Sequence, residues 1–228
     1  MPRLARVICG GVPHHVTQRG NRRGQVFFTS EDHQAYLQWL QEYTEKHEVD
    51  VLAYCLMPNH VHLVVVPKTN QALHRVLKPL HMRYAQRVNR ARNWKGHVWQ
   101  GRYFSSALDE TYLWAAIRYV ELNPVRAGMI HRAEDFAWSS ARAHCGLSSD
   151  PVLSTKPLWL RQFEGIGNWS AWLAEGDERQ SLEMLRKYAD KGLPCGSTSF
   201  IETLEKNTGR LLRYQPQGRP RISSARKG

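Results

Sequence analysis

The spacing of hydrophobic and polar positions divides the chain up to Leu122 into short strands and longer helices. Apolar runs rich in β-branched residues predict strands over residues 11–19, 49–56, 60–66 and 102–108. Apolar residues at helical spacing predict helices over residues 29–47, 69–92 and 109–122. The first helix opens on the cap sequence Thr29-Ser-Glu-Asp, and the second is expected to bend or split at Pro79.

The order of these elements is β-α-β-β-α-β-α, with Met57-Pro58-Asn59 as the turn of a hairpin between the second and third strands. This is the order of the split βαβ, ferredoxin-like arrangement. The expected fold class is therefore α+β, with one antiparallel sheet and helices on one face.

The composition changes after about Gly146. A linker-like stretch is followed by short helices with apolar anchors, and from Lys206 onward there are seven basic residues and no acidic ones. We therefore expect a main domain over residues 1–146 and a smaller, basic, helical C-terminal region over residues 147–228.

The charge of the chain indicates a polyanionic partner. The 32 Lys and Arg against 20 Asp and Glu give a net charge of +12. The segment from Lys68 to Leu108 holds nine basic residues and no acid, so it repels itself unless a negative partner lies against it. Phosphates of a nucleic acid fit this requirement, because binding them releases counterions.

Membrane and disulfide-rich classes are disfavoured. No window approaches the run of about 18 apolar residues that spans a bilayer. The four cysteines are scattered and include no Cys-x-x-Cys pair, which is typical of free thiols in a reducing cytoplasm.

His60 and His62 form a candidate metal site. They lie two apart in a predicted strand, so both imidazoles leave the same face of the sheet. Two imidazoles suit one divalent ion but do not complete its coordination, and a pair of structural histidines is the competing interpretation. His14 and His15 alternate on the first strand, so one of them can approach this site while the other faces away.

The last predicted helix offers a third ligand and a nucleophile. Asn123 ends this helix before Pro124, and its amide oxygen can bind a hard metal ion. Tyr119 lies one turn earlier on the same helical face. On spacing alone, Tyr119 also fits a half-buried aromatic of the core.

Taken together, two segments resemble the HUH single-tyrosine transposases: Met57-Pro-Asn-His-Val-His-Leu-Val and Tyr119-Val-Glu-Leu-Asn-Pro-Val-Arg-Ala-Gly. The resemblance is closest to the REP-associated tyrosine transposases, bacterial enzymes that act beside palindromic repeats. The segment Gly96-His-Val-Trp-Gln-Gly-Arg-Tyr and the tail Gly218-Arg-Pro look like that branch too. The likeness covers residues 5–145 strongly and the C-terminal region weakly.

This resemblance implies a function and a set of site residues. His60, His62 and Asn123 would bind Mg²⁺ or Mn²⁺, and Tyr119 would be the nucleophile. The enzyme would nick and rejoin single-stranded DNA that contains hairpin repeats, through a 5′-phosphotyrosine intermediate. A phenol is almost fully protonated at neutral pH, so it benefits from a cation that stabilises charge. The protein would work as a monomer or homodimer in the bacterial cytoplasm, associated with the nucleoid.

The other candidates are DNA-binding residues. Arg83, Arg87 and Arg90 of the second helix would follow the DNA backbone, a solvated helix face being the alternative. Trp94 and Trp99 alternate with basic residues along the chain and would stack on unpaired bases. Arg102, close to them in sequence, would also contact the DNA. In the tail, Arg219 and Arg221 would enter a minor groove, unless the tail is basic without a specific role.

The alternative function is a domesticated repeat-DNA-binding protein or repressor without required cleavage. The complete set of two histidines, a tyrosine and an asparagine argues against it, because a pure binder needs no nucleophile. A replication or conjugation initiator of the same chemistry is disfavoured by the short chain and the lack of a Gly-rich phosphate loop.

Overall fold

The computed structural model describes residues 6–189 and 191–213. Its centre is one antiparallel sheet in the strand order β2-β3-β1-β4. The strands are β1 (His14–Arg19), β2 (Val49–Met57), β3 (His60–Pro67) and β4 (Phe104–Ala107). The predicted hairpin is confirmed, since β2 and β3 pair directly across the turn at Pro58 and Asn59.

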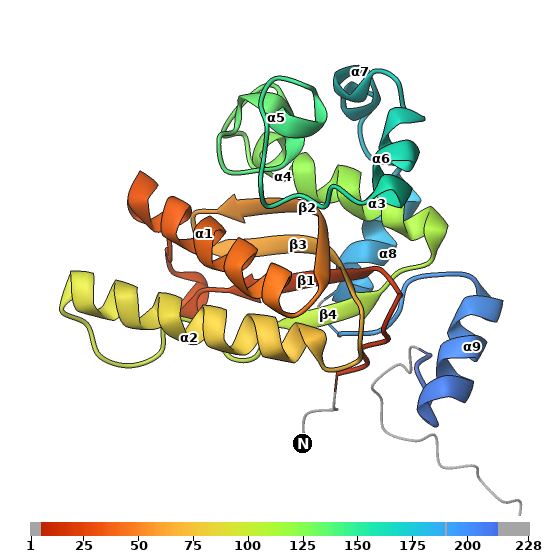
Figure 1. Cartoon of the computed structure of the whole chain (residues 1–228), viewed down its shortest axis with the longest axis horizontal. Helices are drawn as coiled ribbons and strands as arrows, with labels where there is room; N and C mark the ends of the chain where they lie inside the picture. Colours follow the sequence, from red (N-terminus) through yellow and green to blue (C-terminus); the bar gives the residue numbers. More distant parts are fainter. Residues whose placement is uncertain (1–5, 190, 214–228) are drawn as a thin grey trace, which may run out of the picture.

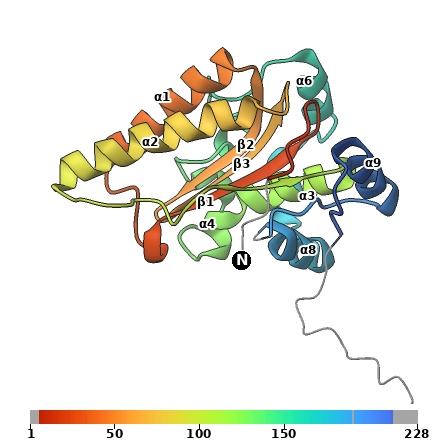
Figure 2. The ribbon, with the colours of Figure 1, turned by 90° about the horizontal axis from the view of Figure 1, so that it is seen from below.

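Two long helices, α1 (Ser30–Lys46) and α2 (Ala72–Arg92), cover one face of the sheet (Figures 1 and 2). The predicted cap of α1 is present as a capping box between Thr29 and Asp32. The helix α2 is not split at Pro79, contrary to one of the sequence-based expectations. Its apolar side chains on both sides of that proline pack into the same core, which holds the helix together.

The expectation that all helices lie on one face is wrong. The helix α3 (Glu110–Glu121) packs on the opposite face, below the sheet in Figure 2. The physical reason is the composition of β2 and β3, which are apolar at almost every position and are buried along nearly their whole length. Strands of this kind need cover on both faces. The order of elements from β1 to α3 is nevertheless the predicted one.

The remaining elements are short helices, most of which follow α3 along the chain. They are η1 (Asn21–Arg23), α4 (Asn123–Arg126), η2 (Ala133–Asp135), α5 (Ala141–His144), α6 (Pro157–Glu164), α7 (Trp169–Ala174), α8 (Arg179–Ala189) and α9 (Thr198–Thr208). Apolar side chains of α6, α7 and α8 join the core formed by α3 and the sheet. The C-terminal region therefore completes the hydrophobic core on this face.

Within the described parts of the chain, no helix is both long and apolar enough to cross a bilayer. All four cysteines are free.

Candidate active site

Strands β1 and β3 gather polar side chains on the face that α3 covers. The β1–β3 register sets Thr17 opposite His62 and Arg19 opposite His60. Residues directly opposite each other in an antiparallel pair point to the same face. Strand β4 sets the apolar side chain of Phe104 beside them, opposite Thr17. The predicted histidine pair therefore lies in a polar patch at one end of the sheet.

Tyr119 of α3 lies against this patch. Its ring centroid is 5.5 Å from that of His62, with the two rings nearly perpendicular, and 5.8 Å from that of His15. Tyr119 lines a pocket of about 280 Å³, which we call the histidine pocket, together with Thr17, Gln18, Arg19, His60, His62, Gln100, Phe104, Arg186 and Ala189. The structure thus brings the predicted nucleophile and both predicted histidine ligands to one place.

A larger cavity of about 510 Å³ lies between α4 and α7 and contains none of these three residues. We therefore take the smaller pocket, where the predicted site residues converge, as the candidate active site.

The tautomer of His60 is fixed by its neighbour Asn59. The Asn59 amide nitrogen donates to the Arg23 carbonyl at 3.1 Å, which orients the amide and leaves its oxygen facing His60. That oxygen lies 2.6 Å from His60 Nδ1 and can only accept, so Nδ1 carries the proton. The lone pair of His60 is therefore on Nε2, where it is available to a metal ion.

His62 is hydrogen-bonded to a second histidine, His15. His62 Nδ1 lies 2.9 Å from His15 Nε2, and both side chains are buried. When His62 donates this hydrogen bond, its own Nε2 carries a lone pair and can bind a metal ion. His15 then holds its proton on Nδ1, a buried atom that has no partner among the described residues. Of the two histidines left open by the sequence, His15 approaches the site, while His14 bonds the Val12 carbonyl.

Burial keeps these imidazoles uncharged at neutral pH. It lowers the pKa of His15 to about 4, and burial together with the nearby Arg19 lowers the pKa of His60 to about 4. Burial, followed by the neighbouring histidines, also holds the pKa of His62 well below its usual range. Neutral imidazoles are the form that binds metal ions.

Asn123 begins the one-turn helix α4 after a break at Leu122, and it does not line the histidine pocket. Its amide nitrogen is buried and lacks a partner among the described residues. Turning the amide by 180° would place the oxygen at the same position. Among those residues, no group of three or more His, Cys, Asp or Glu side chains is arranged for a metal ion. A site built on two histidines therefore needs an amide or a substrate oxygen as a further ligand.

Arg126 holds Tyr119 from the other side. Its guanidinium lies 4.2 Å from the centroid of the Tyr119 ring and donates to the Tyr119 carbonyl. Asp177, just before α8, forms an ion pair with Arg126. The tyrosine ring is therefore clamped between an arginine and two histidines.

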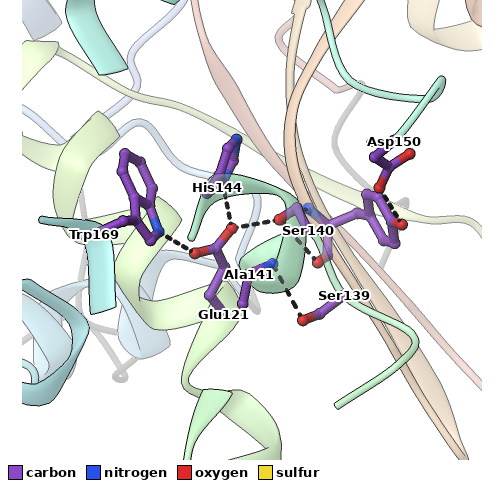
Figure 3. Close-up of polar contacts among 8 residues, drawn as sticks. Glu121, Ser139, Ser140, Ala141, His144, Asp150 and Trp169 are labelled. Atoms are coloured by element: carbon purple, nitrogen blue, oxygen red, sulfur yellow. Dashed lines mark hydrogen bonds and ion pairs between the residues drawn. The ribbon is translucent and has the colours of Figure 1, made fainter. Parts of the chain in front are cut away.

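The end of α3 is anchored by a buried carboxylate, Glu121, which is fully inaccessible to solvent (Figure 3). It accepts hydrogen bonds from the Ser140 hydroxyl, from His144 Nδ1 at 2.6 Å and from the Trp169 indole at 2.7 Å. These donors come from α5, α7 and the turn before α5, so Glu121 ties the tyrosine helix to the C-terminal region. A buried carboxylate is tolerated only with such a set of donors.

The predicted DNA-binding arginines of α2 line one groove, but they differ in their partners. Arg83 pairs with Glu42 at 2.9 Å and Arg87 pairs with the buried Asp32 at 3.0 Å. Arg90 is exposed and forms no ion pair with any described residue.

The other predicted DNA-binding residues are scattered. Trp94 is 51% exposed and Arg102 is exposed, whereas Trp99 is 7% exposed and donates its indole N–H to the His81 carbonyl. Trp99 thus forms part of the core and does not enter the DNA interface that we propose below. Arg219 and Arg221 lie outside the described residues.

Several residues of the site were not selected from the sequence. His15 was weighed without being chosen, while Arg19, Arg126 and Arg186 were passed over. Arg19 follows His15 at alternate strand positions and Arg126 follows Tyr119 at a spacing of two helical turns, so both carried a periodic signal. Arg186 lies in a distant helix, and its sequence gives no sign of its place in the pocket.

Comparison with known families identifies the class of the chain. Residues 11–123 match the family described as "Transposase IS200 like", and this segment spans β1 to the start of α4. The segment thus contains His60, His62, Tyr119 and Asn123 and belongs to the IS200-like transposase family. No curated protein matches the chain.

One solved structure shows that the fold of this chain is shared. The structure of a REP-associated tyrosine transposase bound to a REP hairpin is 17% identical, with a TM-score of 0.52 over 69% of this chain and 93% of that one. A transposase structure from Deinococcus radiodurans R1 is 20% identical, with a TM-score of 0.37 over 52% of this chain and 95% of that one.

The Glu121 cluster predicts a large stability effect for an isosteric change. Glu121→Gln places an NH₂ donor among three donors and leaves at least one of them without an acceptor, so we expect a loss of about 2–3 kcal/mol in the free energy of unfolding. Urea denaturation of the full chain measures it. The control is Glu110→Gln in the exposed first turn of α3, which we expect to cost less than about 1 kcal/mol. Equal effects of the two changes would contradict the anchoring role.

Proposed function

We propose that the protein is a metal-dependent single-strand DNA endonuclease and strand transferase that recognises hairpin-forming repeats and cleaves through Tyr119. The observation that carries this proposal is the packing of the Tyr119 ring against His62 in a pocket that also holds His60. A core tyrosine has no need of two neutral histidines with free ring nitrogens beside it. The IS200-like family and the strand order of a ferredoxin-like domain support the same assignment.

The donor set fits a divalent cation. His60 and His62 would hold it through Nε2, and Asn123 would add its amide oxygen. Mg²⁺ or Mn²⁺, when bound, polarises the scissile phosphate and stabilises the charge that grows on its oxygens. Asn59 keeps His60 in the tautomer that this role requires, and His15 would do the same for His62 by accepting from its Nδ1–H.

The reaction exchanges one phosphoester bond for another. The Tyr119 hydroxyl oxygen attacks the phosphorus and loses its proton, while the bond from phosphorus to the 3′ oxygen breaks. The leaving oxygen takes up a proton and becomes a free 3′-hydroxyl, and the 5′-phosphate stays on the tyrosine. Attack by a 3′-hydroxyl on this linkage rejoins DNA without an external energy source. Arg126 and His62 hold the tyrosine ring for both steps.

The DNA partner is proposed from charge and from fold likeness. The similar transposase structure holds a REP hairpin, and this chain has a net charge of +12. Arg90, Trp94 and Arg102 are exposed and suited to DNA contacts. Arg83 and Arg87 would add to this surface only by giving up their ion pairs.

The nucleophile assignment predicts that Tyr119→Phe abolishes a covalent adduct between the protein and DNA. The substrate is a hairpin oligonucleotide with a single-stranded flank, taken from DNA beside the gene, and Mn²⁺ is added. Denaturing gels detect the adduct, which we also expect to disappear when the metal is chelated. DNA affinity should stay within about twofold of wild type, because one hydroxyl is removed from an otherwise unchanged interface.

Tyr112→Phe is the matched control, since Tyr112 lies earlier on α3 and outside the histidine pocket. An adduct that survives Tyr119→Phe would refute the assignment. If the protein binds the repeat DNA without metal and forms no adduct with any hairpin, the result would favour the alternative function of a DNA-binding protein or repressor.

The role of His15 predicts a loss of metal affinity. His15→Phe removes the acceptor for His62 Nδ1–H, so we expect Mn²⁺ to bind roughly 10- to 100-fold more weakly. Calorimetric titration of the full chain measures this affinity. Nitrogen-15 spectra of the metal-free protein should show that His62 no longer holds one tautomer. His14→Phe is the control, because His14 is equally buried and points away from the site. Unchanged Mn²⁺ affinity in His15→Phe would contradict this role.

The arginines of α2 predict two distinct outcomes. Arg90→Ala should weaken hairpin binding. It should also make the slope of log K against log salt concentration shallower by about 0.9, which is the contribution of one phosphate contact. Arg87→Ala should instead lower stability by about 1–2 kcal/mol, because it leaves the buried Asp32 without its cation. Filter binding at several salt concentrations and urea denaturation separate the two effects. A salt dependence unchanged by Arg90→Ala would exclude Arg90 from the interface.

A further inference from the structure

The helix α8 lies outside the segment that matches the transposase family, yet it forms one wall of the histidine pocket. It packs beside α3 and against the β4 edge of the sheet (Figure 2). The Ser106 hydroxyl of β4 donates to the Tyr188 carbonyl of α8 at 3.2 Å. Just before α8, Asp177 pairs with Arg126, and Glu175 pairs with Arg118 at 3.0 Å. These contacts join α8 to the sheet and to the tyrosine helix.

Arg186 and Ala189 are the residues of α8 that line the pocket. They are three apart and so share one face of the helix. Ala189 is buried and small, which lets the helix approach the sheet, and Arg186 is exposed at the rim. Arg186 forms no hydrogen bond or ion pair with any described residue. An arginine without a protein partner beside Tyr119 is available to an anionic group from outside the chain.

The charges around the pocket point the same way. Arg19 of β1 and Arg186 of α8 approach it from different elements, and none of the described residues that line it is acidic. The third nearby cation, Arg126, is neutralised by Asp177. Burial is the main cause that lowers the pKa of Arg126, and Coulomb repulsion from Arg186 is a weaker one. Arg186 is therefore near enough to act electrostatically on Arg126, the arginine that packs against Tyr119.

We infer that Arg186 binds a backbone phosphate of the DNA strand in the histidine pocket, so that the C-terminal region completes the substrate site. This inference rests on the proposed function. A guanidinium presents two parallel N–H donors that match two phosphate oxygens. Arg19, opposite His60 in the sheet, lines the same pocket from β1 and adds a second cation for the DNA strand. The pocket thus selects a polyanion that threads past Tyr119.

The test measures binding in the Tyr119→Phe background, so that it does not depend on cleavage. The probe is the hairpin oligonucleotide with its single-stranded flank. We expect Arg186→Gln to weaken binding about tenfold and Arg186→Lys to restore part of the loss. The matched control is Arg179→Gln on the same helix, whose side chain is 93% exposed and lies outside the pocket. Circular dichroism checks that each variant is folded.

Neutral methylphosphonate linkages, placed one at a time along the single-stranded flank, locate the contact. At one position, replacing the phosphate by a neutral linkage should weaken binding to the protein that carries Arg186. The same replacement should not weaken binding to Arg186→Gln any further, whereas it should weaken binding to Arg179→Gln as much as to the protein with Arg186 and Arg179 intact. Equal affinity of the two glutamine variants, or no linkage coupled to Arg186, overturns the inference. If the coupling is present but the wild-type chain forms no adduct, the proposed cleavage fails while the phosphate contact stands. Absence of any DNA binding refutes both.

Discussion

The register between β1 and β3 is the constraint on which the whole site depends. Val16 of β1 and Val61, Leu63 and Val65 of β3 are buried on the face covered by α1 and α2. A slip by one residue would move all of these side chains to the other face. The same pairing sets Thr17 opposite His62 and Arg19 opposite His60 on the α3 face. Hydrophobic burial on one side of the sheet therefore fixes the polar geometry on the other.

The tyrosine helix is held at both ends, which gives the phenol a defined place over that polar face. Asp109 caps its first turn through the Tyr112 amide, and Glu121 fixes its last turn through three donors from segments that follow α3 along the chain. A buried carboxylate can satisfy several donors at once, so a small displacement of α3 would break all of these bonds together. The packing of these later segments therefore fixes the position of Tyr119.

The sequence predicts the elements well because their signals are local. The cap at Thr29 and the alternation around His60 each depend on a few neighbouring residues. The face on which α3 packs depends on topology, and strands that are apolar on both sides give no indication of it. Alternation likewise showed that only one of His14 and His15 approaches the site, but the choice between them needed the sheet. Arg186 was beyond prediction, since its contact with the pocket depends on how a distant helix docks.

The charges of the histidine pocket imply that metal and DNA would bind together. Its described lining offers neutral imidazoles and two arginines, without a carboxylate to offset a divalent cation. Coulomb repulsion from Arg19 and Arg186 opposes a divalent cation in the pocket, whereas a bound phosphate reverses the sign of the local field. Each partner therefore strengthens the other, since coupling between two ligands is reciprocal. Under the proposed function, the pocket would be competent only when the strand is present, which would restrict cleavage by Tyr119 to its substrate.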